Sequence, residues 1–159
     1  MEPVIFMFCL TLHNIEESLW LTEWNKKNIS GNRRSPDKQQ FIFAVIGITV
    51  LGYLASGLYL LYPNNNILEL CFSGFVGAML VNAFIPHLLL TIKYRKYCPG
   101  VLTAFLLMIP FNSIILYHAA ISRLKISEIV ISTLIVGLIL LLAIPVFETI
   151  ARRALKDIF

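Results

Sequence analysis

Three ionisable side chains lie close together near the N-terminus, in the stretch His13-Asn14-Ile15-Glu16-Glu17. In a helix, residues three and four positions apart are neighbours, so Glu16 and Glu17 both lie on the side that carries His13. At about 100° per residue, the imidazole and the two carboxylates occupy one arc of roughly 100°. This combination of side chains suits a divalent metal site or a general acid/base pair.

The segments that must position these residues are long and apolar. Hydrophobic residues make up 58% of the 159 residues and charged residues only 14%, whereas about 25% of a soluble domain is charged. A helix needs about 20 residues to cross the hydrocarbon of a bilayer. We therefore predict an all-α, polytopic membrane helix bundle that forms a single domain over residues 1–159. The predicted transmembrane helices cover residues 3–24, 40–62, 67–93, 100–122 and 128–150.

The first predicted helix has two halves of different character. Residues 3–12 are apolar, whereas the second half carries the three ionisable residues described above. Two interpretations follow from this division. Either the whole segment crosses the membrane, or a short apolar anchor precedes an amphipathic helix that lies at the membrane interface.

Lys and Arg residues gather in alternate connections, which predicts how the chain is oriented. Cytoplasmic loops of membrane proteins are enriched in these residues. Five crossings with the N-terminus outside and the C-terminus inside put eleven of the 13 Lys and Arg residues in the cytoplasm. If the first segment does not cross, the same loops stay inside and only the N-terminus changes side. This distribution also explains the net charge of +4 without a nucleic-acid partner.

The segment 67–93 is expected to supply partners for the first helix, because it carries Asn82 and His87. At a rise of 1.5 Å per residue, Glu17 and His87 both fall in the cytoplasmic third of the membrane. Asn82 falls nearer the middle, at the depth of His13. Since ionisable groups at these depths rarely face lipid, we predict that the side chains of His13, Glu17 and His87 lie within several ångströms of one another. The alternative for His87 is an isolated imidazole at the interface.

Other residues are expected to support the bundle. Thr103 lies near the depth of His87, and Asn112 lies at that of His13, where it can bond a neighbouring helix or support the site. His118 falls toward the outer surface, outside the cluster. Small residues at 73, 74, 77 and 78 predict a close contact with another helix, and prolines at 86, 110 and 145 predict bends.

The motif from His13 to Glu17 resembles the one that names the HXXEE domain family of small, mostly bacterial membrane proteins. A second block is also similar to the family: Asn82 and His87, followed by Tyr97, Pro99, Gly100 and Thr103 in YCPGVLT. The resemblance extends from the first to the fourth predicted helix. It implies a multi-pass protein of the bacterial inner membrane whose activity, enzymatic or not, is open, and it supplies no substrate.

The residues favour an intramembrane enzyme. His13, Glu17 and His87 would bind a divalent metal such as zinc and leave one coordination position open for water. Glu16 would be the general base, and Asn82 would orient the substrate or stabilise an oxyanion. The substrate would be a lipid or an apolar, lipid-like molecule reached from the bilayer, and the reaction a hydrolysis.

Three alternatives remain. Without metal, Glu16 and Glu17 would share a proton and act as an acid/base catalyst that hydrolyses a bond or shifts a proton. Intramembrane His and Glu residues also mark proton relays, which would suit a small transporter or a proton-coupled channel. Five short helices without an inverted repeat leave little room for alternating access, although a homo-oligomer would supply more. The last alternative is a non-catalytic accessory or immunity-type membrane protein.

Overall fold

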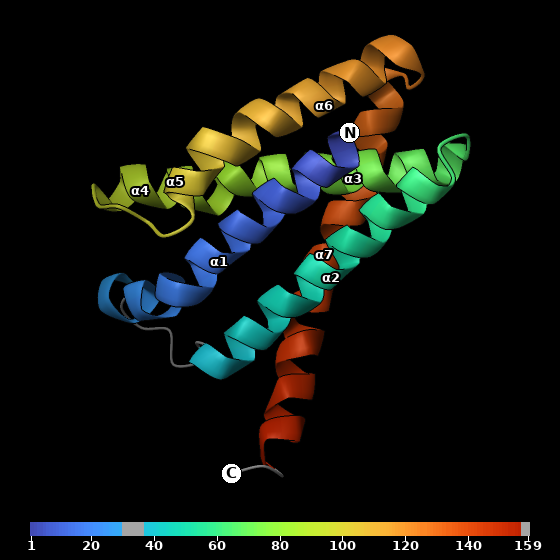
Figure 1. Ribbon diagram of the computed structural model, residues 1–159. Helices are drawn as coiled ribbons and strands as arrows, with labels where there is room; N and C mark the ends of the chain where they lie inside the picture. Colours follow the sequence, from blue (N-terminus) through green and yellow to red (C-terminus); the bar gives the residue numbers. More distant parts are fainter. Residues whose placement is uncertain (30–36, 157–159) are drawn as a thin grey trace.

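The computed structural model describes residues 1–29 and 37–156, and it forms five long helical rods. Two of the rods, Asn66–Tyr94 and Val101–Ser122, consist of several consecutive segments, and each of the others is a single helix (Figure 1). In chain order, the elements are α1 (Glu2–Asn28), α2 (Lys38–Leu61), α3 (Asn66–Asn82), η1 (Ala83–Leu88), α4 (Leu89–Tyr94), α5 (Val101–Thr103), η2 (Ala104–Met108), α6 (Ile109–Ser122) and α7 (Ile126–Lys156). Each rod is long and apolar enough to cross a membrane. The predicted all-α architecture with five spans of this kind is therefore confirmed.

The first segment is one continuous helix of 27 residues. Its apolar beginning and its polar second half are thus parts of the same rod, and the rod is long enough for a full crossing by length and composition. Phe6 and Leu10 are fully buried on its first half. The Phe6 ring packs edge-on against Phe72 and Phe75 of α3, with centroids 5.6 and 5.8 Å away. These contacts fix the α1 face that carries His13 against α3.

Two short irregular stretches interrupt the third and fourth rods: the first is kinked at Ile85, whose backbone is extended, and the second consists of wider, π-helical turns. One is η1, which contains Pro86, and the other is η2, which ends just before Ile109 and Pro110. A proline in a helix lacks the N–H of the regular bond and pushes away the carbonyl of the preceding turn, and wider turns of this kind are frequent at functional sites. The bends predicted at Pro86 and Pro110 thus coincide with irregular turns, whereas α7 continues as a helix through Pro145.

Helix α7 crosses α3 steeply and extends beyond the other helices toward the C-terminus (Figure 1). The two backbones approach closely where α3 has glycines. A methyl group added at Gly74 would lie 2.7 Å from the backbone oxygen of Ser132, and one added at Gly77 would lie 2.0 Å from Thr133 Oγ1. The small residues of α3 therefore serve the close helix contact that their spacing predicts.

Candidate functional site

The structure brings His13, Glu17 and His87 together, as their depths predict. His13 and Glu17 lie one turn apart on α1, and His87 lies in η1. Glu17 Oε1 is 2.6 Å from His87 Nε2 and 3.5 Å from His13 Nε2. The two imidazole rings are perpendicular, with their centroids 5.0 Å apart, and both are completely buried. One ligand atom from each residue falls within 4.8 Å of the other two.

The second nitrogen of each imidazole ring is held by a group behind the cluster. His87 Nδ1 lies 2.8 Å from the carbonyl oxygen of Pro99, so this nitrogen carries a hydrogen and donates it. His13 Nδ1 lies 2.9 Å from Thr103 Oγ1. Because these bonds occupy the Nδ1 atoms, both Nε2 lone pairs are directed toward Glu17. Histidines that bind metals are typically held in this way.

The shortest contact of the cluster needs a proton or a cation between its two atoms. Glu17 Oε1 and His87 Nε2 are 2.6 Å apart, and each is an acceptor when the carboxylate is ionised and the ring is neutral. A proton on His87 or a cation beside both atoms removes the repulsion between their lone pairs. The cluster is therefore built for a proton or a metal ion.

Asn82, the last residue of α3, closes the cluster on the side opposite the backing groups. Its Nδ2 atom lies 3.3 Å from both His13 Nε2 and His87 Nε2. An amide side chain can donate through its nitrogen or accept through its oxygen. Asn82 can thus hydrogen-bond to the neutral imidazoles, or it can turn its amide nitrogen or its amide oxygen toward a molecule that enters the site.

Glu16 points away from Glu17 and is bound by the connection between α4 and α5. Glu16 Oε1 accepts hydrogen bonds from Gly100 N at 2.7 Å and from the Tyr97 hydroxyl. Glu16 Oε2 accepts from Thr103 N at 2.9 Å and Thr103 Oγ1 at 2.5 Å. Both carboxylate oxygens are thus already occupied. Since adjacent helical residues diverge by about 100°, Glu16 lies behind the cluster and binds the connection there. Its expected role as a general base stays a prediction.

Thr103 links the two parts of the site. Its hydroxyl can donate only one hydrogen, and the 2.5 Å distance assigns that hydrogen to Glu16 Oε2. The oxygen is then free to accept the hydrogen of His13 Nδ1. A chain of hydrogen bonds therefore runs from His13 through Thr103 to Glu16, and it fixes which nitrogen of the His13 ring faces Glu17.

The connection of residues 95–100 packs directly on the His87 ring. Gly100 has a φ of +95°, which favours glycine, and a methyl group added there would lie 2.5 Å from His87 Cε1 and 2.6 Å from Nδ1. Tyr97 lies outside the long rods. Partial burial of its phenol raises its pKa, and the hydrogen bond to the Glu16 carboxylate raises it further, so Tyr97 remains a hydrogen-bond donor.

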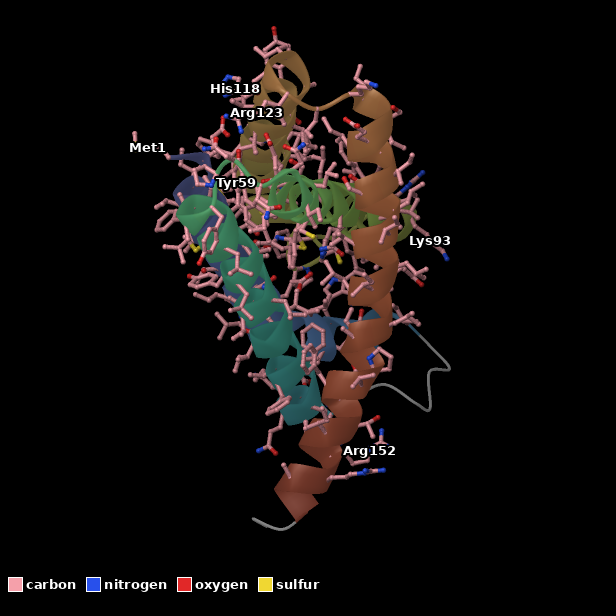
Figure 2. All side chains as sticks on the ribbon, turned by 90° about the vertical axis from the view of Figure 1, so that its right-hand side faces the viewer. Met1, Tyr59, Lys93, His118, Arg123 and Arg152 are labelled. Carbon is pink, nitrogen blue, oxygen red and sulfur yellow. The ribbon has the colours of Figure 1, made fainter. Side chains whose placement is uncertain are left out.

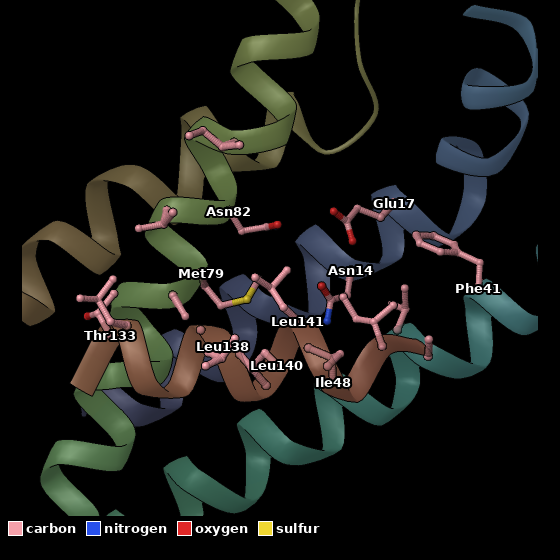
Figure 3. Close-up of a pocket in the computed structure, with 18 residues that line it drawn as sticks. Asn14, Glu17, Phe41, Ile48, Met79, Asn82, Thr133, Leu138, Leu140 and Leu141 are labelled. Carbon is pink, nitrogen blue, oxygen red and sulfur yellow. The ribbon is translucent and has the colours of Figure 1, made fainter. Parts of the chain in front are cut away.

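A cavity of about 440 Å³ opens beside the cluster, between α1, α2, α3 with η1, and α7. Figure 3 shows Glu17 of α1 and Asn82 of α3 facing each other at one end of it. Asn14 also lines this end, and its Nδ2 is bonded to Thr49 Oγ1 at 2.8 Å. Most of the remaining wall is made of aliphatic side chains. The cavity is therefore an apolar chamber with a polar end. Glu17 lines this end, and it is the only lining residue from the cluster of His13, Glu17 and His87, here called the His/Glu/His cluster.

Comparison with known proteins identifies the family. The family model described as "Protein of unknown function with HXXEE motif" matches residues 4–115. The chain belongs to the HXXEE family. It is also 45% identical over 149 residues to the "Uncharacterized protein YrkK" of Bacillus subtilis (strain 168), a match that covers 93% of this chain and 94% of that relative. No solved structure matches the chain. The resemblance inferred from the motif is thus confirmed.

The ionisable residues of the HXXEE motif have two separate roles in this fold. The His and the second Glu, His13 and Glu17, meet His87, and Glu17 also lines the cavity. The first Glu, Glu16, binds the connection that backs both imidazoles. Sequence reasoning missed this second role, because two of the three donor residues contact Glu16 through backbone N–H groups. The available signal was the Pro99-Gly100 turn followed by Thr103.

Two other polar residues considered from the sequence, Asn112 and His118, lie outside the His/Glu/His cluster. Asn112 of α6 donates to the carbonyl oxygen of Val76 at 3.2 Å, so it bonds a neighbouring helix. His118 pairs with Glu2 at 2.6 Å. Figure 2 shows His118 and Arg123 toward the end of the molecule opposite Arg152. Its expected position outside the cluster is therefore confirmed.

Proposed function

We propose that this HXXEE protein is a membrane-embedded, metal-dependent hydrolase that acts on a lipid-like molecule. One observation carries the proposal: His13 Nε2, Glu17 Oε1 and His87 Nε2 converge within 4.8 Å at the polar end of an apolar cavity. The cluster supplies the chemistry, and the cavity supplies a place for an apolar substrate. Both are formed within helices that are long and apolar enough to cross a membrane.

The donor set fits a divalent ion such as zinc. Two imidazoles and one carboxylate are the three protein ligands of several catalytic zinc sites, and they leave one position for water or substrate. The hydrogen bonds from His87 Nδ1 to Pro99 and from His13 Nδ1 to Thr103 leave the Nε2 atoms free to bind it. A cation would also offset the cost of burying the Glu17 carboxylate, which is large when no partner charge is present.

The residues around the cluster would support hydrolysis in distinct ways. A bound divalent ion would polarise a carbonyl group and lower the pKa of a bound water. Asn82 would donate a hydrogen bond to the carbonyl oxygen of the substrate, and Glu16 would keep His13 oriented through Thr103. In the reaction, the hydroxyl part of water bonds to the carbonyl carbon. The bond from that carbon to the leaving oxygen or nitrogen breaks, and the leaving group takes up the remaining proton.

Metal analysis of the detergent-purified protein tests this function. We expect about one divalent ion per chain when no chelator is used, and a rise in melting temperature when zinc is returned to chelator-treated protein. His13→Ala and Glu17→Ala should lose most of the ion. His118→Ala is the matched control and should keep it, because His118 pairs with Glu2 away from the cluster.

Two outcomes would contradict the proposal of a metal-dependent hydrolase. The first is an ion content well below one per chain together with a melting temperature that zinc does not change. A metal-free acid/base catalyst that uses Glu17 and the two imidazoles would then be the better reading. The second is zinc- or proton-driven flux into liposomes that contain the purified protein, which would support a transporter.

We further infer that the N-terminus lies outside and the C-terminus inside, as in a protein of the bacterial inner membrane. Lys96 Nζ is 3.0 Å from Asn28 Oδ1, so the basic connection after α4 meets the basic end of α1. Arg152 and Arg123 lie at opposite ends of the molecule (Figure 2). Connections rich in Lys and Arg, such as those that follow α1 and α4, are expected to be cytoplasmic. The same rule places Arg152 inside and Arg123 outside.

Single-cysteine labelling in intact cells checks this orientation. In a background without the native cysteines, Arg123→Cys should react with a membrane-impermeant maleimide, because Arg123 lies at the outer end and is exposed. Arg152→Cys should react only after the cells are opened. Reaction of Arg152→Cys in intact cells would reverse the inferred orientation.

A further inference from the structure

The cavity runs along α7 from Thr133 to Ile144. With a rise of 1.5 Å per residue, this stretch covers about 16 Å, or roughly half the thickness of the hydrocarbon core. Its volume of about 440 Å³ falls at the lower end of the range for small-molecule sites. These dimensions fit one hydrocarbon chain that lies along α7 with its head at Glu17 and Asn82.

The mouth of the cavity opens between α3 with η1 on one side and α7 on the other. Several residues that line the cavity are also exposed on the molecular surface, and all of them are aliphatic: Val81, Ile85, Leu134, Leu138 and Leu141. They belong to rods that are long and apolar enough to cross a membrane. The surroundings of this mouth are therefore hydrocarbon, and a molecule that enters through it comes sideways from the lipid.

The polar end of the cavity favours a neutral head group. Its polar lining consists of Asn14, Glu17 and Asn82, and none of the cavity-lining residues in the described part of the chain is Lys or Arg. A phosphate would meet the Glu17 carboxylate without the Arg or Lys partner that phosphates usually require. A neutral carbonyl needs only a hydrogen-bond donor, which the Asn82 amide provides, and it can also be polarised by a divalent ion.

We propose that the substrate is a neutral, single-chain lipid with an ester or amide carbonyl. It enters sideways between α3 and α7, its chain fills the cavity along α7, and its carbonyl lies at Asn82 beside the His13, Glu17 and His87 cluster. This inference rests on the proposed hydrolase function and adds to it the class of substrate and the route of entry.

A photoreactive, alkyne-tagged monoacylglycerol is the probe for this inference, used with the full-length protein in nanodiscs. We expect labelled peptides from α7 and from the α3–η1 region. Excess monoolein should reduce the labelling, whereas lysophosphatidylglycerol and a diacylglycerol should not. Equal competition by lysophosphatidylglycerol would contradict the inferred preference for a neutral head group. Equal competition by the diacylglycerol would contradict the inferred preference for a single hydrocarbon chain.

A matched pair of variants tests the cavity itself. Leu138 lines the cavity and is 58% exposed, whereas Leu142, one turn further along α7, is 61% exposed and does not line it. Leu138→Trp should lower the labelling that monoolein displaces by at least about tenfold, because the larger side chain fills the space for the chain. Leu142→Trp should leave the labelling unchanged. Similar labelling of both variants would contradict entry between α3 and α7 and binding of the lipid chain in the cavity.

The metal content of the same samples separates this inference from the proposed function. Both tryptophan variants should keep about one ion per chain, since neither changes a ligand. Loss of displaceable labelling with the ion retained is the result that supports the cavity as the lipid site. Wild-type protein that lacks the ion but is labelled as expected contradicts the hydrolase and supports the lipid site. Protein that holds the ion but shows no displaceable labelling contradicts the lipid site alone.

Discussion

Replacing Glu16 by alanine will lower the free energy of unfolding by about 3–5 kcal/mol, because several buried hydrogen-bond donors lose their acceptor at once. The carboxylate is 5% exposed and accepts hydrogen bonds from Tyr97, Gly100 and Thr103. Alanine leaves these donors without an acceptor inside the protein, and each orphaned donor costs about 1–3 kcal/mol. Denaturant titration of the purified variant, followed by circular dichroism, measures the change.

Glutamine at position 16 will not restore this stability, although it has the same shape. Each oxygen of Glu16 faces donors, so the amide nitrogen of glutamine must face donors whichever way it turns. Glu23→Gln is the matched control. Glu23 is on the same helix, but it is exposed and pairs with the exposed Lys26, so its replacement should change the unfolding free energy by less than about 0.5 kcal/mol. A Glu16→Ala protein as stable as this control would show that Glu16 does not hold the connection.

Gly100→Ala is expected to disrupt the His/Glu/His cluster without changing any of its residues. The added methyl group would lie 2.5 Å from His87 Cε1, and the φ of +95° disfavours any residue with a side chain. The His87 ring or the connection must therefore move. We expect zinc affinity to fall by more than about tenfold, as for other changes to the groups that orient metal ligands, and stability to fall by about 1–3 kcal/mol.

Gly57→Ala provides the comparison for this variant. Gly57 lies inside α2, and a methyl group added there has open space around it. Since alanine favours helix over glycine by about 0.5–1 kcal/mol, this variant should be as stable as the wild type or slightly more so. Zinc titration and thermal melting of the two variants, side by side, check the prediction. Equal zinc affinity in both would mean that the contact between Gly100 and His87 does not position the imidazole.

The helices and their approximate bounds could be predicted, because the length of each apolar segment and the residues of the turns between segments determine them locally. The meeting of His13, Glu17 and His87 could also be predicted, since a constant rise per residue gives the depth of each group along its helix. The rotation of each helix is set by packing, as when Phe6 of α1 contacts Phe72 and Phe75. The depth of a residue does not reveal that rotation.

The role of Glu16 shows where the sequence reaches its limit. Its neighbour Glu17 has the same chemistry, and a helical projection puts both on the side of His13. The structure separates them because the backbone N–H groups of Gly100 and Thr103 are aligned toward Glu16. Every residue except proline has such a group, so the residue types alone do not assign it, and the Pro99-Gly100 turn before Thr103 was the one indirect signal. The cavity was likewise beyond prediction, because it depends on how α7 crosses α3.

The order in which the chain is synthesised determines when the cluster can be completed. The two imidazoles and Glu17 come from the first and third rods, but the groups that hold their Nδ1 atoms, Pro99 and Thr103, follow the third rod in the chain. One wall of the cavity is α7, the last helix. A nascent chain that still lacks the last two helices therefore carries every proposed ligand without Thr103 behind His13 and without the α7 wall of the cavity. The proposed site can therefore be complete only after the final helix has been made and has packed on α3, and a chain cut short before α7 would lack one wall of the cavity.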